Sequence, residues 1–104
     1  MYKIALVCEN GASTGLCMRK MIDAAKKQGL DCDINAYALS QIGELVTEKD
    51  CFLFGPQIAF KLDGVKKQHP DYATRMTVIP PMDFGMMDGE KILKDAIALI
   101  DSLA

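Results

Sequence analysis

Short apolar runs alternate along this chain with segments in which apolar residues recur at helical spacing. Residues 4–7, 51–54 and 76–79 are largely apolar, and residues 32–37 form a more mixed segment with strand character. These runs are too short for buried helices, and an uninterrupted apolar run is typical of a strand covered on both faces. The alternation therefore predicts βα units around a parallel sheet.

Four other segments have the helical pattern: residues 14–28, residues 40–46, a segment that begins at Pro56, and a segment that follows Asp88. Ser13, Ser40 and Asp88 each stand where a side-chain oxygen can cap a helix start. Pro56 suits the first helical position because its missing N–H has no helical partner there. Helices on both sides of the strands are therefore expected.

These elements predict an α/β fold: a three-layer αβα sandwich with a four-stranded parallel sheet in the order 2-1-3-4. Right-handed crossovers limit how βα units can wind, and this order places a switch point beside the first strand. Cys8, Gly55 and Pro80 then fall at the carboxyl ends of their strands, so three loops converge at one edge. We expect residues 1–104 to form a single domain.

Charge and cysteine content narrow the classes of function. The formal net charge is −2 with both signs interspersed, which disfavours nucleic acid and an anionic membrane surface as the main partner. The apolar run near the start is too short for a signal peptide, so we expect a cytoplasmic protein. The four cysteines lack a C-x-x-C pair and accompany a single histidine, so free thiols are expected, with no metal and no cofactor.

The stretch that carries chemistry follows the first strand and resembles a phosphate-binding loop in composition: Cys8, Glu9, Asn10, Gly11, Ala12, Ser13, Thr14 and Gly15. A loop that runs into a helix start offers unpaired amides and the positive end of the helix dipole. The same field should lower the pKa of the Cys8 thiol. We therefore predict a nucleophilic cysteine in an anion-binding loop.

Four other readings of this loop remain open at the level of the residues. A cysteine at a strand end is often only a small core residue. A phosphatase of the Cys-x5-Arg kind needs an arginine where this chain has Thr14. Thiol redox chemistry would pair Cys8 with Cys17, although their spacing is not a redox motif. A noncatalytic anion-sensing module would use the same loop without transferring a group.

Two segments together resemble the IIB components of the phosphoenolpyruvate-dependent sugar phosphotransferase system (PTS), of the lactose/cellobiose type. One is the strand that ends at Cys8 with its Gly-Ala-Ser-Thr loop, and the other is Gly55-Pro56-Gln57 after the third apolar run. Length and element order agree, so the resemblance covers essentially the whole chain. One departure is Glu9, because family members commonly have a small residue directly after the cysteine.

The resemblance implies a phosphocysteine relay. Cys8 would accept a phosphoryl group from a phosphohistidine of the IIA protein and pass it to a sugar bound by the IIC membrane permease. Residues 9–15 would bind the phosphoryl group, chiefly through backbone amides. The sugar would be cellobiose, chitobiose, lactose or another β-glucoside, and the chain would be a monomer that reaches the membrane only through IIC.

Three features outside the loop complete the expectations. His69 precedes a proline in a polar segment and is expected to be a solvated loop residue, so the phosphohistidine belongs to another protein. Residues 82–87 are rich in methionine and suit either partner docking or coverage of the sheet. We expect Glu9 to point outward, or to meet a basic residue of a partner, because a carboxylate close to a phosphoryl group is unfavourable.

Overall fold

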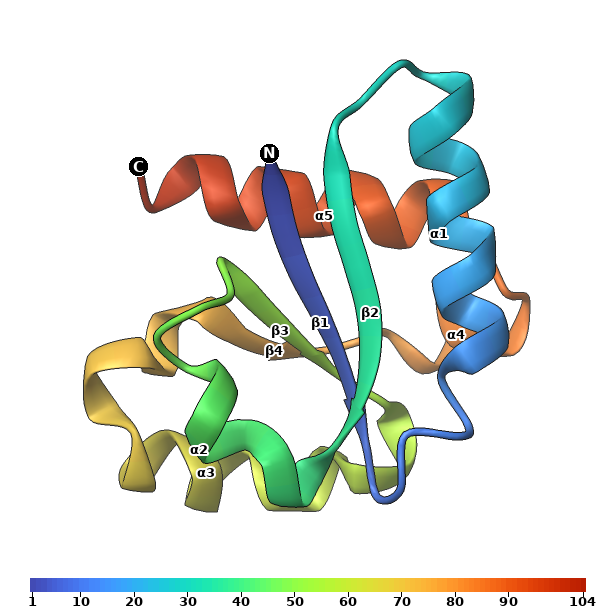
Figure 1. Ribbon diagram of the computed structural model, residues 1–104. Helices are drawn as coiled ribbons and strands as arrows, with labels where there is room; N and C mark the ends of the chain where they lie inside the picture. Colours follow the sequence, from blue (N-terminus) through green and yellow to red (C-terminus); the bar gives the residue numbers. More distant parts are fainter.

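The computed structural model describes all residues, 1–104, and shows a sheet with helices on both faces (Figure 1). Its strands are β1 (Tyr2–Cys8), β2 (Cys32–Ala38), β3 (Cys51–Phe54) and β4 (Met76–Val78). Its α-helices are α1 (Gly15–Lys27), α2 (Ile42–Leu45), α3 (Leu62–Gln68), α4 (Pro81–Gly85) and α5 (Gly89–Ser102). Three 3₁₀ segments, η1 (Leu39–Gln41), η2 (Pro56–Lys61) and η3 (Pro70–Arg75), connect them.

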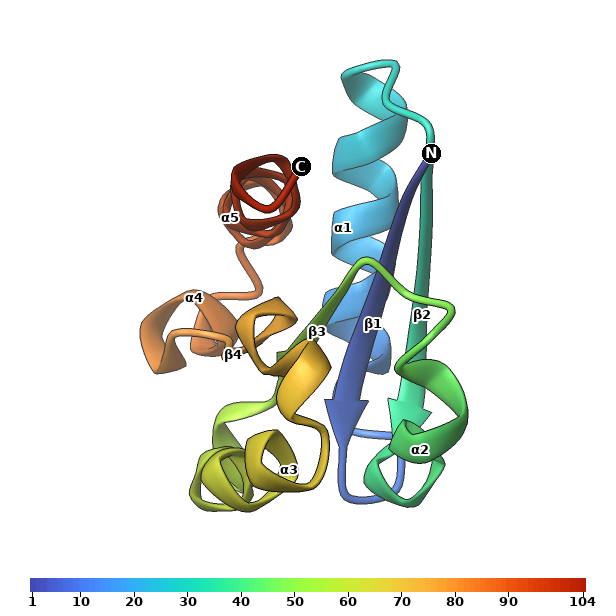
Figure 2. The same ribbon diagram turned by 90° about the vertical axis from the view of Figure 1, so that its left-hand side faces the viewer.

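All strands are parallel and follow the order β2-β1-β3-β4, which confirms the predicted topology. β1 is a central strand, paired with β2 along its full length and with β3 from Ile4 to Val7. The carboxyl ends of the strands lie at one edge, where the chain leaves each strand toward α1, η1, η2 or α4 (Figure 2). The loop after Cys8 therefore lies between the loops of both neighbouring strands.

Alternate side chains of the strands enter two different apolar clusters, because successive strand residues point to opposite faces. Ile4 and Leu6 of β1 pack with α1 and α5, whereas Ala5 and Val7 pack with α2 and α3. Both clusters contain fully buried side chains from β3 as well. This two-sided burial explains the uninterrupted apolar run and confirms the three-layer arrangement.

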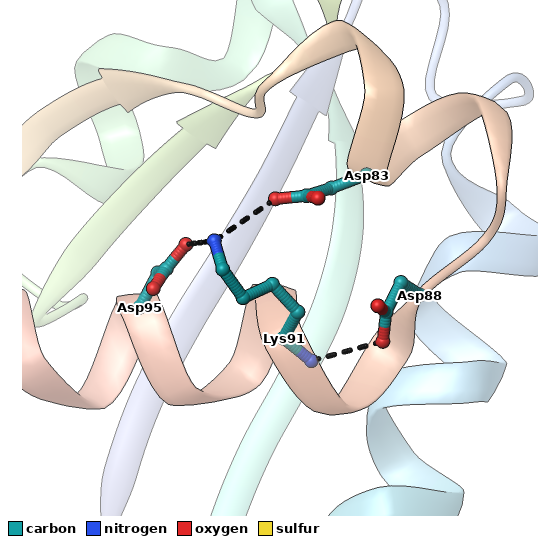
Figure 3. Close-up of polar contacts among 4 residues, drawn as sticks. All are labelled: Asp83, Asp88, Lys91 and Asp95. Atoms are coloured by element: carbon teal, nitrogen blue, oxygen red, sulfur yellow. Dashed lines mark hydrogen bonds and ion pairs between the residues drawn. The ribbon is translucent and has the colours of Figure 1, made fainter.

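The layer formed by α1 and α5 is closely packed where the helices meet. A Cβ atom placed on Gly89 would lie 2.4 Å from the backbone carbon of Lys20, so only glycine fits at this contact. Asp88 caps α5 as predicted, since its Oδ1 accepts a hydrogen bond of 3.1 Å from the Lys91 amide (Figure 3). Lys91 also reaches two carboxylates, those of Asp83 and Asp95.

The opposite layer is less regular than the sequence pattern indicates. The segment after Pro56 is not one helix: η2 contains Ile58 outside the helical region, with φ −116° and ψ 20°, and α3 follows it. The predicted cap at Ser40 is wrong, because this residue lies within η1 and the Ala38 amide instead donates to Gln41 Oε1 at 2.9 Å. The longer amide side chain reaches back over the turn and leaves the serine exposed.

Two further details differ from expectation. The cap assigned to Ser13 is wrong, since α1 begins at Gly15 and Thr14 occupies the N-cap position without a side-chain cap bond. The segment expected as a loop after β4 contains the short helix α4. None of the helices has the combination of length and apolar character that a bilayer span requires.

Candidate active site

Cys8 ends β1 at the sheet edge where the predicted loops converge. Its Cα pairs with that of Ala38 in β2, and the residue is 1% exposed. It belongs to neither of the two apolar clusters, in contrast to Cys17 and Cys51. Cys8 is therefore almost completely buried, with Thr14 of its own loop in contact with the sulfur.

The loop above Cys8 is compact, yet most of it is exposed. Gly11 has φ +83°, and a Cβ atom there would lie 3.4 Å from both the Tyr37 carbonyl carbon and the Ala38 amide nitrogen. A glycine therefore allows the turn to rest on the end of β2. Asn10 Oδ1 accepts from the Ala12 amide at 3.0 Å and closes the turn locally.

Several amides of this loop have no oxygen acceptor within the protein. Hydrogen bonds from the loop amides to protein oxygens involve only Ala12 and Gly15, which leaves those of Glu9, Asn10, Gly11, Ser13 and Thr14 without such a partner. Amides in this state attract negative charge, as in other anion-binding turns. The predicted anion-binding character of the loop thus has a physical basis in the backbone.

Hydrogen bonds to the Cys8 sulfur determine its ionisation. Thr14, which is 0% exposed, places its Oγ1 3.6 Å from the sulfur as a donor. Burial alone acts to raise the pKa of the Cys8 thiol, but hydrogen bonds from the side chains and amides of Ser13 and Thr14 outweigh it. The pKa therefore lies below the ordinary cysteine value, as predicted from the loop composition.

The other cysteines have the opposite tendency. Burial raises the pKa of Cys17 to about 11, and burial together with the Asp50 charge raises that of Cys51 to about 12. Burial and the neighbouring Asp31 also raise the pKa of Cys32. All four thiols are free, and Cys17 stays protonated at neutral pH, which disfavours the redox reading with Cys8.

The Gly-Pro-Gln segment lies against the cysteine loop. The Gly55 amide donates to the Val7 carbonyl at 2.8 Å, which holds the start of η2 beside the end of β1. A Cβ atom on Gly55 would lie 2.7 Å from Gln57 Oε1 and 3.6 Å from Thr14 Cγ2. The two motifs that suggested the family are therefore adjacent in space, although no bond from Gln57 to the loop is present.

An ion pair joins the same two segments at the surface. Lys61 Nζ lies 3.2 Å and 3.1 Å from the two carboxylate oxygens of Glu9. Glu9 points outward as expected, with its side chain 66% exposed. The basic residue that it meets belongs to its own chain, and sequence reasoning missed Lys61 because no local pattern connects η2 with the cysteine loop.

The remaining candidates form no hydrogen bond with the cysteine loop. Met82 of α4 and Met86 directly after it are 75% and 74% exposed, whereas Phe84 and Met87 pack against the apolar cluster that contains α1 and α5 residues, so the segment both covers that layer and exposes two methionines. His69 follows α3 and is partly buried rather than fully solvated. No three His, Cys, Asp or Glu side chains gather as a metal site.

Comparisons with known proteins agree with this geometry. The family model described as "PTS system, Lactose/Cellobiose specific IIB subunit" matches residues 3–95. The oligo-beta-mannoside-specific EIIB component of Bacillus subtilis is 34% identical over 96% of this chain and 97% of its own. The galactose-specific EIIB component of Lactococcus lactis is 37% identical over 94% and 95%.

A solved structure gives the same result at the level of the fold. The cellobiose-specific phosphotransferase IIB component protein from Borrelia burgdorferi superimposes with a TM-score of 0.83. It is 29% identical and the match covers 97% of this chain and 93% of that one. The sheet order and helix layers described above are therefore those of a known IIB structure.

Proposed function

This chain belongs to the lactose/cellobiose-specific IIB subunit family of the sugar PTS, and on that premise we propose that it carries a phosphoryl group on Cys8 between a donor protein and a sugar. The observation that supports this most directly is the contrast among the thiols. Only Cys8 has a pKa that is lowered, whereas those of the other three cysteines are raised. A thiolate, not a thiol, is the attacking species.

In the first step, the Cys8 thiolate attacks phosphorus on a phosphohistidine of the IIA protein. The S–P bond forms as the N–P bond breaks, and the electron pair of that bond returns to the imidazole nitrogen. In the second step, a sugar hydroxyl oxygen attacks the same phosphorus, the S–P electron pair returns to sulfur, and the hydroxyl proton passes to water. The thiolate is regenerated, so no cofactor or metal is needed for balance.

The loop supplies the place for the phosphoryl oxygens. Amides of residues 9–15 that lack protein acceptors can donate to them, and the Thr14 hydroxyl stabilises the sulfur when it becomes the leaving group. Since Cys8 is 1% exposed, the exposed residues above it must shift when a donor approaches. The hydrogen bonds that hold them are the local Asn10–Ala12 bond and the exposed Glu9–Lys61 pair, so such a shift is inexpensive.

The sugar is chosen mainly by the IIC permease in this proposal. Relatives named for oligo-beta-mannoside and galactose are 34% and 37% identical to this chain, so the subunit sequence does not separate the two sugars. We propose a β-glucoside or lactose-type disaccharide as the substrate class. The exposed Met82 and Met86 lie on the same edge and suit contact with IIA or IIC.

The alternative function is a hydrolase, and the residue at position 14 argues against it. The position that a Cys-x5-Arg phosphatase gives to arginine holds Thr14, whose hydroxyl is directed at the sulfur. Without a guanidinium clamp, the phosphocysteine lacks one aid to attack by water. This favours a carrier that retains the group until an acceptor arrives.

The test is incubation with phosphorylated IIA of the lactose/cellobiose type, followed by intact-mass measurement. We expect one phosphoryl group on the wild type and on Cys17→Ser, and none on Cys8→Ser. The Cys17 variant is the matched control because it removes a thiol that belongs to the apolar interior. A phosphoryl group on Cys8→Ser would contradict the site, and release of phosphate from an aryl phosphate by the wild type would favour the hydrolase.

A further inference from the structure

Glu9 occupies a position where its charge is unfavourable locally, and Lys61 lies close enough to offset that charge. Lys61 is both the last residue of η2 and the N-cap residue of α3, so the two helix ends act on its ammonium in opposite directions. Glu9 directly follows the cysteine, where a carboxylate opposes an incoming phosphoryl group. Residues that violate local rules in this way often serve a site rather than the fold.

The two charges compensate each other across the edge of the sheet. The Lys61 ammonium lies within hydrogen-bond distance of both Glu9 oxygens, at 3.1 and 3.2 Å. Of the 12 lysines and arginines in the chain, only Lys61 bonds to a side chain of the cysteine loop. No other carboxylate bonds to Lys61, so the pair is isolated from the remaining surface charges.

We propose that Lys61 is a charge-compensating, positioning residue of the Cys8 site, which allows a phosphoryl group to reside beside Glu9. The proposal rests on the proposed function of Cys8. In the free protein the ammonium neutralises the Glu9 carboxylate. When Cys8 carries a phosphoryl group of about −2 charge, Lys61 balances the added charge and keeps the loop from opening by repulsion.

The weakness of the ion pair supports this role. Lys61 and Glu9 have side-chain exposures of 35% and 66%, and pairs with such exposure contribute little to folding stability. A weak pair can be redistributed between the carboxylate and a phosphoryl oxygen without disturbing the core. The irregular η2 segment that carries Lys61 also leaves the backbone freer to adjust than a long helix would.

A partner-free experiment measures this compensation directly. Cys8 is alkylated with iodoacetate, which is anionic, and with iodoacetamide, which is neutral, and the ratio of the two rates is taken. Both reagents attack the same thiolate, so the ratio is insensitive to the Cys8 pKa and reports the local potential. We expect Lys61→Met to lower the ratio roughly threefold at low salt, because Glu9 is left uncompensated.

The companion variants make the result specific. Glu9→Ser should raise the ratio, and the double variant Glu9→Ser with Lys61→Met should return it to near the wild-type value. Lys67→Met is the matched control: it changes the net charge equally within α3, and Lys67 is exposed without an ion pair. An unchanged ratio in Lys61→Met, or an equal decrease in Lys67→Met, would overturn the proposal.

The phosphoryl form gives the second measurement. With phosphorylated IIA, the equilibrium ratio of phosphorylated to unphosphorylated protein should fall about tenfold in Lys61→Met, since the phosphoryl group carries about twice the charge of iodoacetate. The double variant Glu9→Ser with Lys61→Met should recover most of the lost phosphorylation. If wild-type Cys8 accepts no phosphoryl group, the proposed function fails. If the wild type is labelled and Lys61→Met equals it, only the role of Lys61 fails.

Discussion

Cys8 and Cys17 are both almost completely buried, yet their surroundings shift the pKa of the two thiols in opposite directions. Cys8 is 1% exposed and Cys17 is 0% exposed, so solvent access does not distinguish them. What differs is the set of neighbours: hydroxyl and amide donors surround Cys8, whereas Cys17 lies in the apolar cluster between the sheet, α1 and α5. Donors, rather than exposure, make a buried thiol reactive.

The contrast extends to the regions around these residues. The edge that holds Cys8 is built from a short glycine-containing loop and the 3₁₀ segment η2, with free amides and exposed side chains. The layer that holds Cys17 is built from the two longest helices, which touch closely at Gly89. The loop after Cys8 therefore presents free amides, whereas the contact between α1 and α5 leaves no room for a side chain at Gly89.

The largest expected difference is in thiol reactivity. At pH 8, Cys8 should be alkylated by iodoacetamide at least about 100-fold faster than Cys17 or Cys51, since their pKa values of about 11 and 12 leave few thiolates. The Cys8 rate should level off at a lower pH than that of an ordinary thiol, because its pKa is lowered. Peptide mapping after timed quenching measures this, and equal rates would remove the contrast.

The packed layer should be the more sensitive to added volume. Gly89→Ala places a methyl group 2.4 Å from the Lys20 backbone, so we expect the free energy of unfolding to fall by about 2–3 kcal/mol. Gly64→Ala in α3 is the control, since nothing lies within 4 Å of that position. Urea denaturation measures both, and similar midpoints for the two variants would show that the layers are equally tight.

Removal of one donor should weaken the distinction of Cys8 without unfolding the protein. Thr14→Val keeps the shape of the side chain but removes the hydroxyl that lies 3.6 Å from the sulfur. The Cys8 pKa should rise, and alkylation at pH 7 should slow by roughly threefold to tenfold. A pH profile of the alkylation rate checks this, and Ser13→Ala tests the exposed hydroxyl in the same way. An unchanged profile in both would assign the effect to the amides.

The smallest effect is expected at the ion pairs drawn in Figure 3. Lys91 bonds to Asp95 and Asp83, and hydrogen bonds with these two carboxylates raise its pKa. Its side chain is 48% exposed, so solvent screens both ion pairs. Lys91→Met should leave the denaturation midpoint nearly unchanged. A large decrease would show that surface charges, rather than packing alone, hold α4 against α5.

Much of the architecture could be predicted because local patterns encode it. The apolar run of β1 and the glycine-containing loop after Cys8 were sufficient to locate the nucleophile at a strand end, and crossover handedness limited the sheet order. Glu9 and Lys61, which are 52 positions apart, meet only after folding, so no sequence period marks their contact. Ser13 fits the sequence preference for a helix N-cap. That preference does not reveal that the hydroxyl of the next residue, Thr14, is directed at the Cys8 sulfur.

The alternation along β1 fixes which helices the reactive sulfur can meet. Ile4 and Leu6 face α1 and α5, and Cys8 has the same parity, so its sulfur comes under the start of α1. Insertion of one residue into β1 would turn the thiol toward α2 and α3, away from the Thr14 hydroxyl. The register of β1 thus decides which helical layer the thiol faces, and an insertion between Leu6 and Cys8 preserves that side only if it adds an even number of residues.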